Sequence, residues 1–211
     1  MIKRTVDKAF QSAEQGNEIA AVFHCPTQRE SDVGLPVVGA TGENLSALLH
    51  MIRVGKRGAD YLVWSRSSIM IVNLSEKTNE TEKTLRRLTN DRDCLRRLEE
   101  LLAGQKTILC FGQWAARACE RIYRGDNSVK VVSVYHLSPH ALNQIVKTED
   151  GRLIEDSIEL NPRFYRIKVI ADYVCRCLSD DTKHLFTYDD FRNEIKKLRV
   201  ERKRNGNHHE L

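Results

Sequence analysis

The chain has 211 residues, of which 41% are hydrophobic and 30% are charged, and its formal net charge is +5. This size and composition fit one domain with a full hydrophobic core. No window approaches the roughly 20 apolar residues of a membrane span, and the first ten residues, MIKRTVDKAF, contain no apolar signal core. A membrane or secreted protein is therefore not expected, and we predict a soluble, cytoplasmic one.

Cysteine usage supports the same compartment. The six cysteines lie mostly inside apolar runs and have no CxxC spacing, which favours reduced thiols over a disulfide framework. They are Cys25, Cys94, Cys110, Cys119, Cys175 and Cys177.

Strand-like runs alternate with helical patterns along the chain. The first helical pattern places Ile2, Val6, Ala9, Phe10 and Ala13 on one face and ends at Gly16. Predicted strands cover residues 18–24, 68–74, 107–112 and 129–135, and predicted helices cover 45–52, 85–102, 114–123, 164–178 and about 189–199. This order predicts a three-layer α/β/α sandwich with a central, mostly parallel four-stranded sheet.

The basic excess lies at the end of the chain. Residues 192–204 hold seven Lys or Arg and two Glu, a net of +5, so the rest of the chain balances to zero. A helix that contacts nucleic-acid phosphates and a merely solubilising helix end explain this equally well. The phosphate-binding interpretation assigns the phosphate contacts to Lys196, Lys197 and Arg199. We expect a main domain at 1–190 and a basic helix and tail at 191–211.

The loop after the first buried strand is the most informative segment. It reads VFHCPTQRESDVGLPVVGATG from Val22 to Gly42. Its prolines stiffen the backbone and its glycines permit positive φ or close approach, as a loop folded around a small planar ligand requires. Ligands of parallel sheets bind beyond the carboxyl ends of the strands, where this loop and His24, Asn73, Gly112 and His136 should converge.

Together with HLSP at 136–139, this loop resembles the active-site motifs of the uracil-DNA glycosylase superfamily. The match is to the branch whose first motif reads GEAPGxxExxxGxPFVGxxG, and the segments ILCFGQWAA and IMIVNL resemble its "LGxxA" turn and "ITNxV" strand. The resemblance covers roughly residues 18–145. Matching positions in the first motif are Pro26, Glu30, Gly34, Pro36, Val38, Gly39 and Gly42.

The resemblance implies a monomeric DNA glycosylase that flips a base out of DNA and hydrolyses its glycosidic bond. Asn73 would read the pyrimidine edge, beside Phe23, Val37 and Pro26, although it could instead only cap its strand. His136 would donate to the pyrimidine O2 as negative charge develops, although it could be a packed loop histidine.

Further residues take DNA-binding roles from the same resemblance. Ser138 and the backbone at Gly34 and Gly39 would hold flanking phosphates. His140 stands where relatives place the wedge that fills the vacated stack, with Leu142 as the alternative.

Departures from the motif narrow the expected chemistry. His24 replaces the glutamate that positions water in relatives, and a neutral imidazole can orient or deprotonate water but supplies no negative charge. Phe23 and Thr27 replace two glycines of the motif, and Leu137 replaces a proline. Carboxylates remain nearby at Glu30 and Asp32, and we expect Glu30 to structure the loop rather than to catalyse.

The substrate prediction depends on Val37, which replaces the phenylalanine that stacks on uracil in relatives. Losing a stacking partner worth about 1 to 3 kcal/mol predicts a wider or differently shaped pocket. A bulky modified pyrimidine would fit such a pocket, for example a hydroxymethylated or glucosylated cytosine of phage DNA, which implies antiviral defence. Stacking on Phe23 would instead keep ordinary uracil as a substrate.

No metal or cofactor is expected. The iron-sulfur branch of the family takes cysteines from an N-terminal CxxC, and residues 1–24 here contain none. Cys25 stands at the family's alanine and is predicted to be a packed thiol rather than a nucleophile. The alternatives to a modified-base glycosylase are ordinary uracil repair and a non-catalytic DNA-binding relative.

Overall fold

The computed structural model describes residues 9–13, 17–55, 64–147, 153–154 and 161–205, with side chains described as far as Leu198. Within these residues a twisted sheet of six strands has the order β1-β3-β2-β4-β5-β6. The strands are β1 (Phe10–Gln11), β2 (Ile19–Phe23), β3 (Met70–Asn73), β4 (Thr107–Phe111), β5 (Lys130–Val134) and β6 (Leu185–Phe186). Only β1 is antiparallel to its neighbour, as far as the described strands go.

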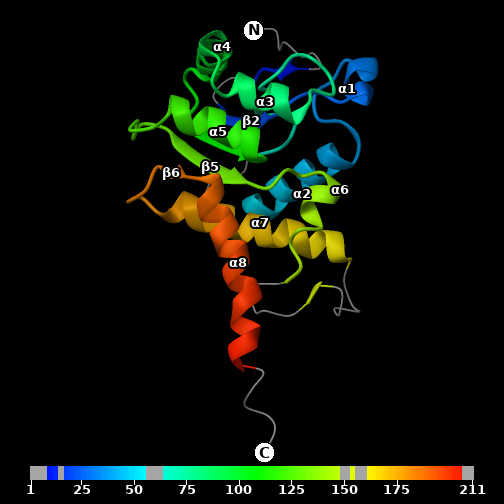
Figure 1. Cartoon of the computed structure of the whole chain (residues 1–211), viewed down its shortest axis with the longest axis vertical. Helices are drawn as coiled ribbons and strands as arrows, with labels where there is room; N and C mark the ends of the chain where they lie inside the picture. The colour runs from blue at the N-terminus through cyan, green and yellow to red at the C-terminus, as the bar shows by residue number, and fades with distance from the viewer. Residues whose placement is uncertain (1–8, 14–16, 56–63, 148–152, 155–160, 206–211) are drawn as a thin grey trace, which may run out of the picture.

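Helices cover both faces of this sheet (Figure 1). They are α1 (Gln28–Val33), α2 (Gly39–Gly55), α3 (Glu82–Leu88), α4 (Arg92–Leu102), α5 (Gln113–Ile122), α6 (Pro139–Leu142), α7 (Pro162–Ser179) and α8 (Tyr188–Asn205). Successive side chains of β2 divide between two cores: Ala21 and Phe23 pack with α2 and α7, whereas Ala20 and Val22 pack with α3, α4 and α5. The three-layer α/β/α prediction is therefore confirmed, with a mostly parallel sheet of six described strands instead of four.

Two of the predicted helices differ from the structure. Phe10, expected on a helical face with Ile2, Val6, Ala9 and Ala13, lies in β1 and pairs with Val72. Sheet pairing at the open edge of β3 overrides the weak helical period there, and residues 1–8 lie outside the described part of the chain.

The predicted helix at 85–102 is two helices. The first, α3, ends at Leu88, and the chain turns at Thr89 and Asn90. Asp91 then caps α4 by accepting a hydrogen bond from the Cys94 amide at 2.9 Å. Leu85, Leu98 and Leu102 are buried on both sides of this break, so the apolar pattern continued although the helix did not.

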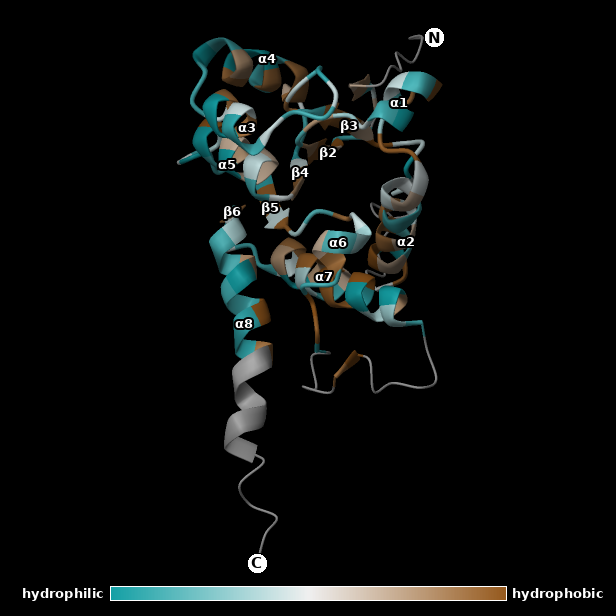
Figure 2. Ribbon diagram, turned by 45° about the vertical axis from the view of Figure 1, so that its right-hand side comes forward, coloured by the Kyte–Doolittle hydropathy of each residue, from teal (hydrophilic) through white to brown (hydrophobic). Residues whose placement is uncertain are grey.

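The last helix leads away from the carboxyl edge of the sheet. Its first residue, Tyr188, lies with its ring 5.8 Å from that of Tyr135, just past the end of β5. Further on, Glu194 pairs at 3.2 Å with Arg176 near the C-terminal end of α7, the end that reaches back to the start of β5. Figure 1 shows the rest of α8 projecting from the body, and Figure 2 shows its hydrophilic colouring up to the grey portion.

Candidate active site

A small cavity lies where three parallel strands end. Its volume is about 40 Å³. It is lined by Phe23, His24, Cys25, Thr27, Glu30, Val37, Val38, Thr41, Asn73 and His136. The expected convergence of residues from separate strands on one edge of the sheet is thus present, and five of the six predicted catalytic and base-binding residues line the same cavity.

The ends of β2 and β3 are fastened to each other beyond the last paired residues. The Leu74 amide donates to the Phe23 carbonyl at 2.8 Å, and the Ser75 amide donates to the His24 carbonyl at 2.9 Å. The parallel ladder therefore continues past the ends of β2 and β3. The backbone that carries Phe23 and His24 is held beside the one that carries Asn73, which is only 1% exposed.

His136 is held in one tautomer by its own loop. The Ser138 amide donates to Nδ1 at 3.1 Å, so in the neutral ring the proton sits on Nε2. Burial, with a smaller contribution from His24, lowers the pKa of His136 to about 3. Gly112 lies against this residue at φ 90°, a backbone conformation that favours glycine, although a Cβ there would make only an ordinary contact of 3.4 Å with the His136 Cβ. His136 is therefore a neutral N–H donor.

His24 lies beside it, with ring centroids 4.6 Å apart. Burial also lowers the pKa of His24, so this ring too is neutral at physiological pH. Phe23 stacks on Phe111 at 4.7 Å and meets the edge of His136 at 5.7 Å. One face of the Phe23 ring is thus already covered by another ring.

Glu30 braces the loop that forms the other wall. Its buried carboxylate accepts hydrogen bonds from the Thr27 and Val37 amides, and Thr27 caps α1 in return. This short helix occupies part of the predicted loop. The brace holds Val37 at φ 53°, a conformation that a β-branched residue rarely adopts. We expected Glu30 to structure the loop, and these contacts are of that kind.

Glycines serve the loop at three places. Gly34 ends α1 at φ 69° and Gly39 begins α2 at φ 68°, both outside the cavity lining. At Gly42 a Cβ would lie 2.1 Å from the Val37 carbonyl oxygen, so only glycine lets the two backbones meet there. Pro26 is buried, and its carbonyl accepts from the Asn79 amide at 3.1 Å; it does not line the cavity.

The loop after β5 is anchored from behind by Asn44 of α2. Its Nδ2 donates to the Leu137 carbonyl at 2.6 Å, and its Oδ1 accepts from the Arg163 guanidinium of α7. Leu137, at the position of the family's proline, is fully buried and packs into the core. Packing therefore supplies the rigidity that a proline ring would give.

The remaining predicted DNA-binding residues divide into two groups. Ser138 caps α6 through its hydroxyl, and His140 is exposed on that helix close to the cavity loop, whereas Leu142 is 1% exposed and belongs to the core. Lys196 and Lys197 are exposed on the part of α8 that leads away from the cavity. The Arg199 side chain lies outside the described residues.

A larger groove of about 650 Å³ lies across the loop from the cavity. His50, Arg53 and Trp64 are among the residues that line it. Arg66 crosses from this groove to donate to the Pro36 carbonyl at 3.0 Å. The groove does not touch the strand ends that carry His24, Asn73 and His136.

Sequence reasoning missed the residues that support the cavity from other elements. Asn44 and Arg97 act through contacts with carbonyls distant in sequence, and no local pattern signals them. The signal for α1 was present, because Thr27 and Glu30 have the spacing of a capping box.

The described residues contain no group of three or more His, Cys, Asp or Glu placed to hold a metal ion. An iron-sulfur cluster does not fit the cysteines that are described, since Cys110 and Cys119 are buried within the core and Cys25 is the one that lines the cavity. No described helix is long and apolar enough to cross a bilayer.

Comparison with known proteins identifies the family of the chain through a family model. No curated protein matches the chain. The family model of the uracil DNA glycosylase superfamily matches residues 21–153, a stretch that begins within β2, extends past α6 and includes every described residue that lines the cavity. The chain belongs to the uracil DNA glycosylase superfamily, whose members are typically DNA glycosylases.

Proposed function

We propose that the protein is a monomeric, monofunctional DNA glycosylase that flips out an altered or modified pyrimidine and hydrolyses its glycosidic bond. The observation that carries this proposal is the neutral His136, aimed by Ser138, in one cavity with Asn73. A pyrimidine presents an acceptor at O2 and a donor and acceptor along its edge. This pair of side chains can match all three.

His136 stabilises the leaving base. Negative charge develops on the pyrimidine as the glycosidic bond breaks, and a preorganised N–H donor stabilises that charge without reorganisation. Because the pKa of His136 is lowered to about 3, the ring donates a hydrogen bond from Nε2 but does not protonate the base at neutral pH. The base therefore leaves as an anion.

His24 takes the place of the family's glutamate on the water side. As a neutral imidazole it orients the attacking water and accepts its proton. Among the described residues that line the cavity, Glu30 carries the carboxylate, and its two backbone hydrogen bonds keep that carboxylate in the loop wall. It contributes negative potential toward the cationic sugar while its main task is to brace Val37.

The substrate must widen the cavity before it can bind. A volume of about 40 Å³ holds about one water molecule, whereas ligand pockets usually exceed about 300 Å³. We propose that substrate binding moves the loop that carries Val37, between the turns at Gly34 and Gly39, and thereby breaks the hydrogen bond that holds the Val37 amide to Glu30. Valine leaves more room than a phenyl ring would, which favours pyrimidines with a bulky substituent.

Modified cytosines of phage DNA, hydroxymethylated or glucosylated, are the substrate class that we propose. Their excision would serve antiviral defence in the cytoplasm. The alternative substrate, uracil, is favoured by one observation: Phe23 lines the cavity, where its ring could contact a plain pyrimidine. The second alternative is a non-catalytic DNA-binding relative.

A panel of DNAs tests the proposal. The protein is incubated with DNA from phages that carry different base modifications and with uracil-containing DNA, and released bases are identified by mass spectrometry. Release of a modified pyrimidine supports the proposal. Release of uracil alone assigns the protein to uracil repair, and the absence of alkali-sensitive abasic sites on every DNA leaves the non-catalytic alternative.

A further inference from the structure

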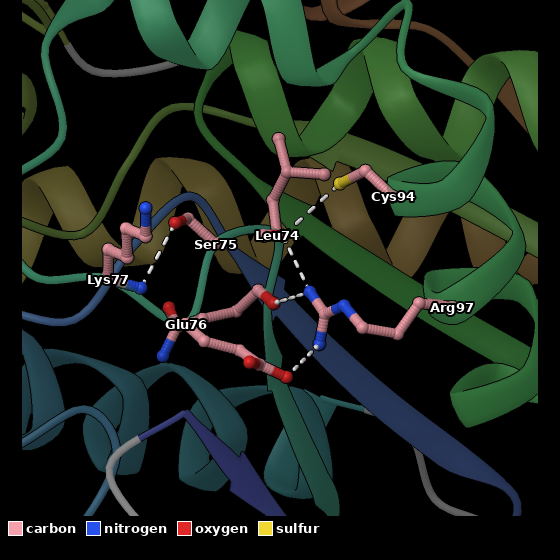
Figure 3. A network of polar contacts seen from close by, with 7 residues as sticks. Leu74, Ser75, Glu76, Lys77, Cys94 and Arg97 are labelled. Atoms are coloured by element: carbon pink, nitrogen blue, oxygen red, sulfur yellow. Dashed lines mark hydrogen bonds and ion pairs between the residues drawn. The ribbon is translucent and has the colours of Figure 1, made fainter.

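The C-terminal end of β3 is held by a side chain from the helical layer that contains α3, α4 and α5. Arg97, on α4, donates to the Asn73 carbonyl at 3.1 Å and to the Leu74 carbonyl at 2.6 Å. Its other nitrogen pairs with Glu76 at 3.2 Å. Figure 3 shows the guanidinium reaching Leu74 and Glu76, with the Cys94 thiol on the same Leu74 carbonyl at 3.5 Å.

These carbonyls belong to the peptides that place the base-reading groups. The Asn73 carbonyl follows directly on the side chain that lines the cavity, and the Leu74 amide is the donor to Phe23. The next amide, that of Ser75, donates to His24. One guanidinium thus fixes the backbone that joins Asn73 to Phe23, the last residue of β2, and to His24, which follows it; both face the same cavity.

The chemistry of this contact explains why an arginine stands there. Both residues at the tip are 1% exposed, and a buried carbonyl without a donor is costly. Only a side chain with several donors in a fixed fork can hold two successive carbonyls and a surface carboxylate together. Lysine offers the charge without the fork.

We propose that Arg97 is a positioning residue for base recognition: it holds the Asn73–Leu74 peptide so that the Asn73 amide keeps its aim into the cavity. This inference rests on the proposed function of the cavity. It adds a residue from α4, outside the four motifs that carry the family resemblance.

Three variants test it. Arg97→Met keeps the length of the side chain and removes every donor, and Arg97→Lys keeps the charge. Arg96→Met is the matched control, because Arg96 is the neighbouring residue of α4, is exposed, and has its described ion pair with Asp93 one turn back. All three are compared by single-turnover base release, by affinity for the substrate DNA and for the same DNA with an abasic site, and by amide hydrogen exchange.

We expect Arg97→Met to lower the single-turnover rate constant about 10-fold to 100-fold and to lower affinity for the base-containing DNA, while affinity for the abasic DNA is unchanged. Arg97→Lys should restore part of the rate. Exchange of the Leu74 and Ser75 amides should accelerate in Arg97→Met while that of Val72, deeper in the strand, stays slow. Arg96→Met should match wild type throughout.

Two results overturn the inference. One is an Arg97→Met variant with the wild-type rate constant. The other is equal loss of affinity for base-containing and abasic DNA together with faster exchange at Val72, which marks a merely structural role. Failure of the proposed function is recognised separately, because the wild-type protein would then release no base from any DNA.

Discussion

At the scale of single residues, His136 is the group on which the proposed chemistry depends most. His136→Ala should raise the barrier of the chemical step by about 2 to 4 kcal/mol, the cost of one lost donor to a developing oxyanion. DNA affinity should persist, since the exposed residues around the cavity are unchanged. Single-turnover rates and DNA binding measure both quantities.

His50→Ala is the control, because His50 is exposed on α2 and points into the separate groove. A His136→Ala variant with the wild-type single-turnover rate would remove His136 from the mechanism.

The two histidines predict a pH profile. Burial lowers both pKa values below the ordinary histidine value of about 6.5, so each ring is neutral above it. As pH falls, His24 takes up a proton first and loses its capacity to accept one from water, whereas His136 stays neutral to about pH 3. The rate constant should be level above about pH 6.5 and fall on the acid side.

Single-turnover rates of wild type and His24→Gln across this range provide the test. The acid limb should be missing in His24→Gln, which has no group to titrate there. A wild-type rate that rises as pH falls would contradict the assignment of His24 as an acceptor.

Val37 decides between the two substrate classes. Val37→Phe should obstruct a bulky substituent and so lower release of a modified pyrimidine, while uracil release stays equal or improves through stacking. Because Val37 is 1% exposed, the larger ring can also cost about 1 to 3 kcal/mol of stability, and thermal unfolding must be recorded beside the rates. Efficient wild-type release of uracil, with none from any modified DNA, would reject the modified-base proposal.

At the scale of elements, buried polar contacts join the helices to the loops of the site. Asn44→Ala would leave the buried Leu137 carbonyl without its donor, at about 1 to 3 kcal/mol, whereas the half-exposed Arg163 guanidinium keeps its ion pair with Glu43. The free energy of unfolding, measured in urea, should fall by an amount of that order. The rate constant should fall too, because the loop that aims His136 loses its anchor.

Ser46→Ala on the same helix is the control, since the exposed Ser46 hydroxyl bonds only within α2 among the described contacts. Loss of stability in Asn44→Ala with an unchanged rate constant would show that the loop holds its shape without the anchor.

Elements with a strong local pattern could be predicted from the sequence, and elements made by tertiary pairing could not. The four central strands are buried on both faces and read as continuous apolar runs, which is why their positions were predicted closely. β1 and β6 are two residues long and exist through pairing with β3 and β5. The β-propensity of two residues is too weak to predict an edge strand of that length.

The site shows the same division. His24, Asn73 and His136 follow strand ends, so their convergence follows from the topology of a parallel sheet. Arg97 and Asn44 bind backbone carbonyls, and because every residue has one, the sequence does not indicate which carbonyl a side chain will bind. The size of the cavity was also not predictable, because it depends on how the loop that Glu30 braces packs against the strand ends.

At the scale of the whole molecule, α8 begins beside Tyr135 at the end of β5 and then leads away from the cavity, past Arg176 of α7, to project from the body (Figure 1). We therefore propose that Lys196 and Lys197 contact DNA away from the flipped base. The double variant Lys196→Gln/Lys197→Gln should weaken binding equally for all bases and flatten the slope of log K against log salt by up to about two. The single-turnover rate constant at saturating protein should not change.

Truncation before Arg192 is a poorer test, because it also removes Ile195, which is buried in the core. The control is Lys83→Gln/Lys106→Gln, which removes two exposed charges, one on α3 and one just before β4 that pairs with Glu18. An unchanged affinity and salt slope in the α8 variant would leave this helix a solubilising one.

The closed cavity has a consequence for how the protein searches DNA. If every base must first widen the same wall, the cost of opening is common to all of them and leaves the preference between two flipped bases untouched. The cost of opening does raise the binding free energy that a base needs in order to leave the DNA duplex, because the apparent affinity of the cavity falls with the fraction of protein in which it is open. Ordinary bases, which gain little from the open pocket, then stay stacked. A protein whose cavity is closed in the absence of substrate can therefore move along undamaged DNA without binding the ordinary bases that it encounters.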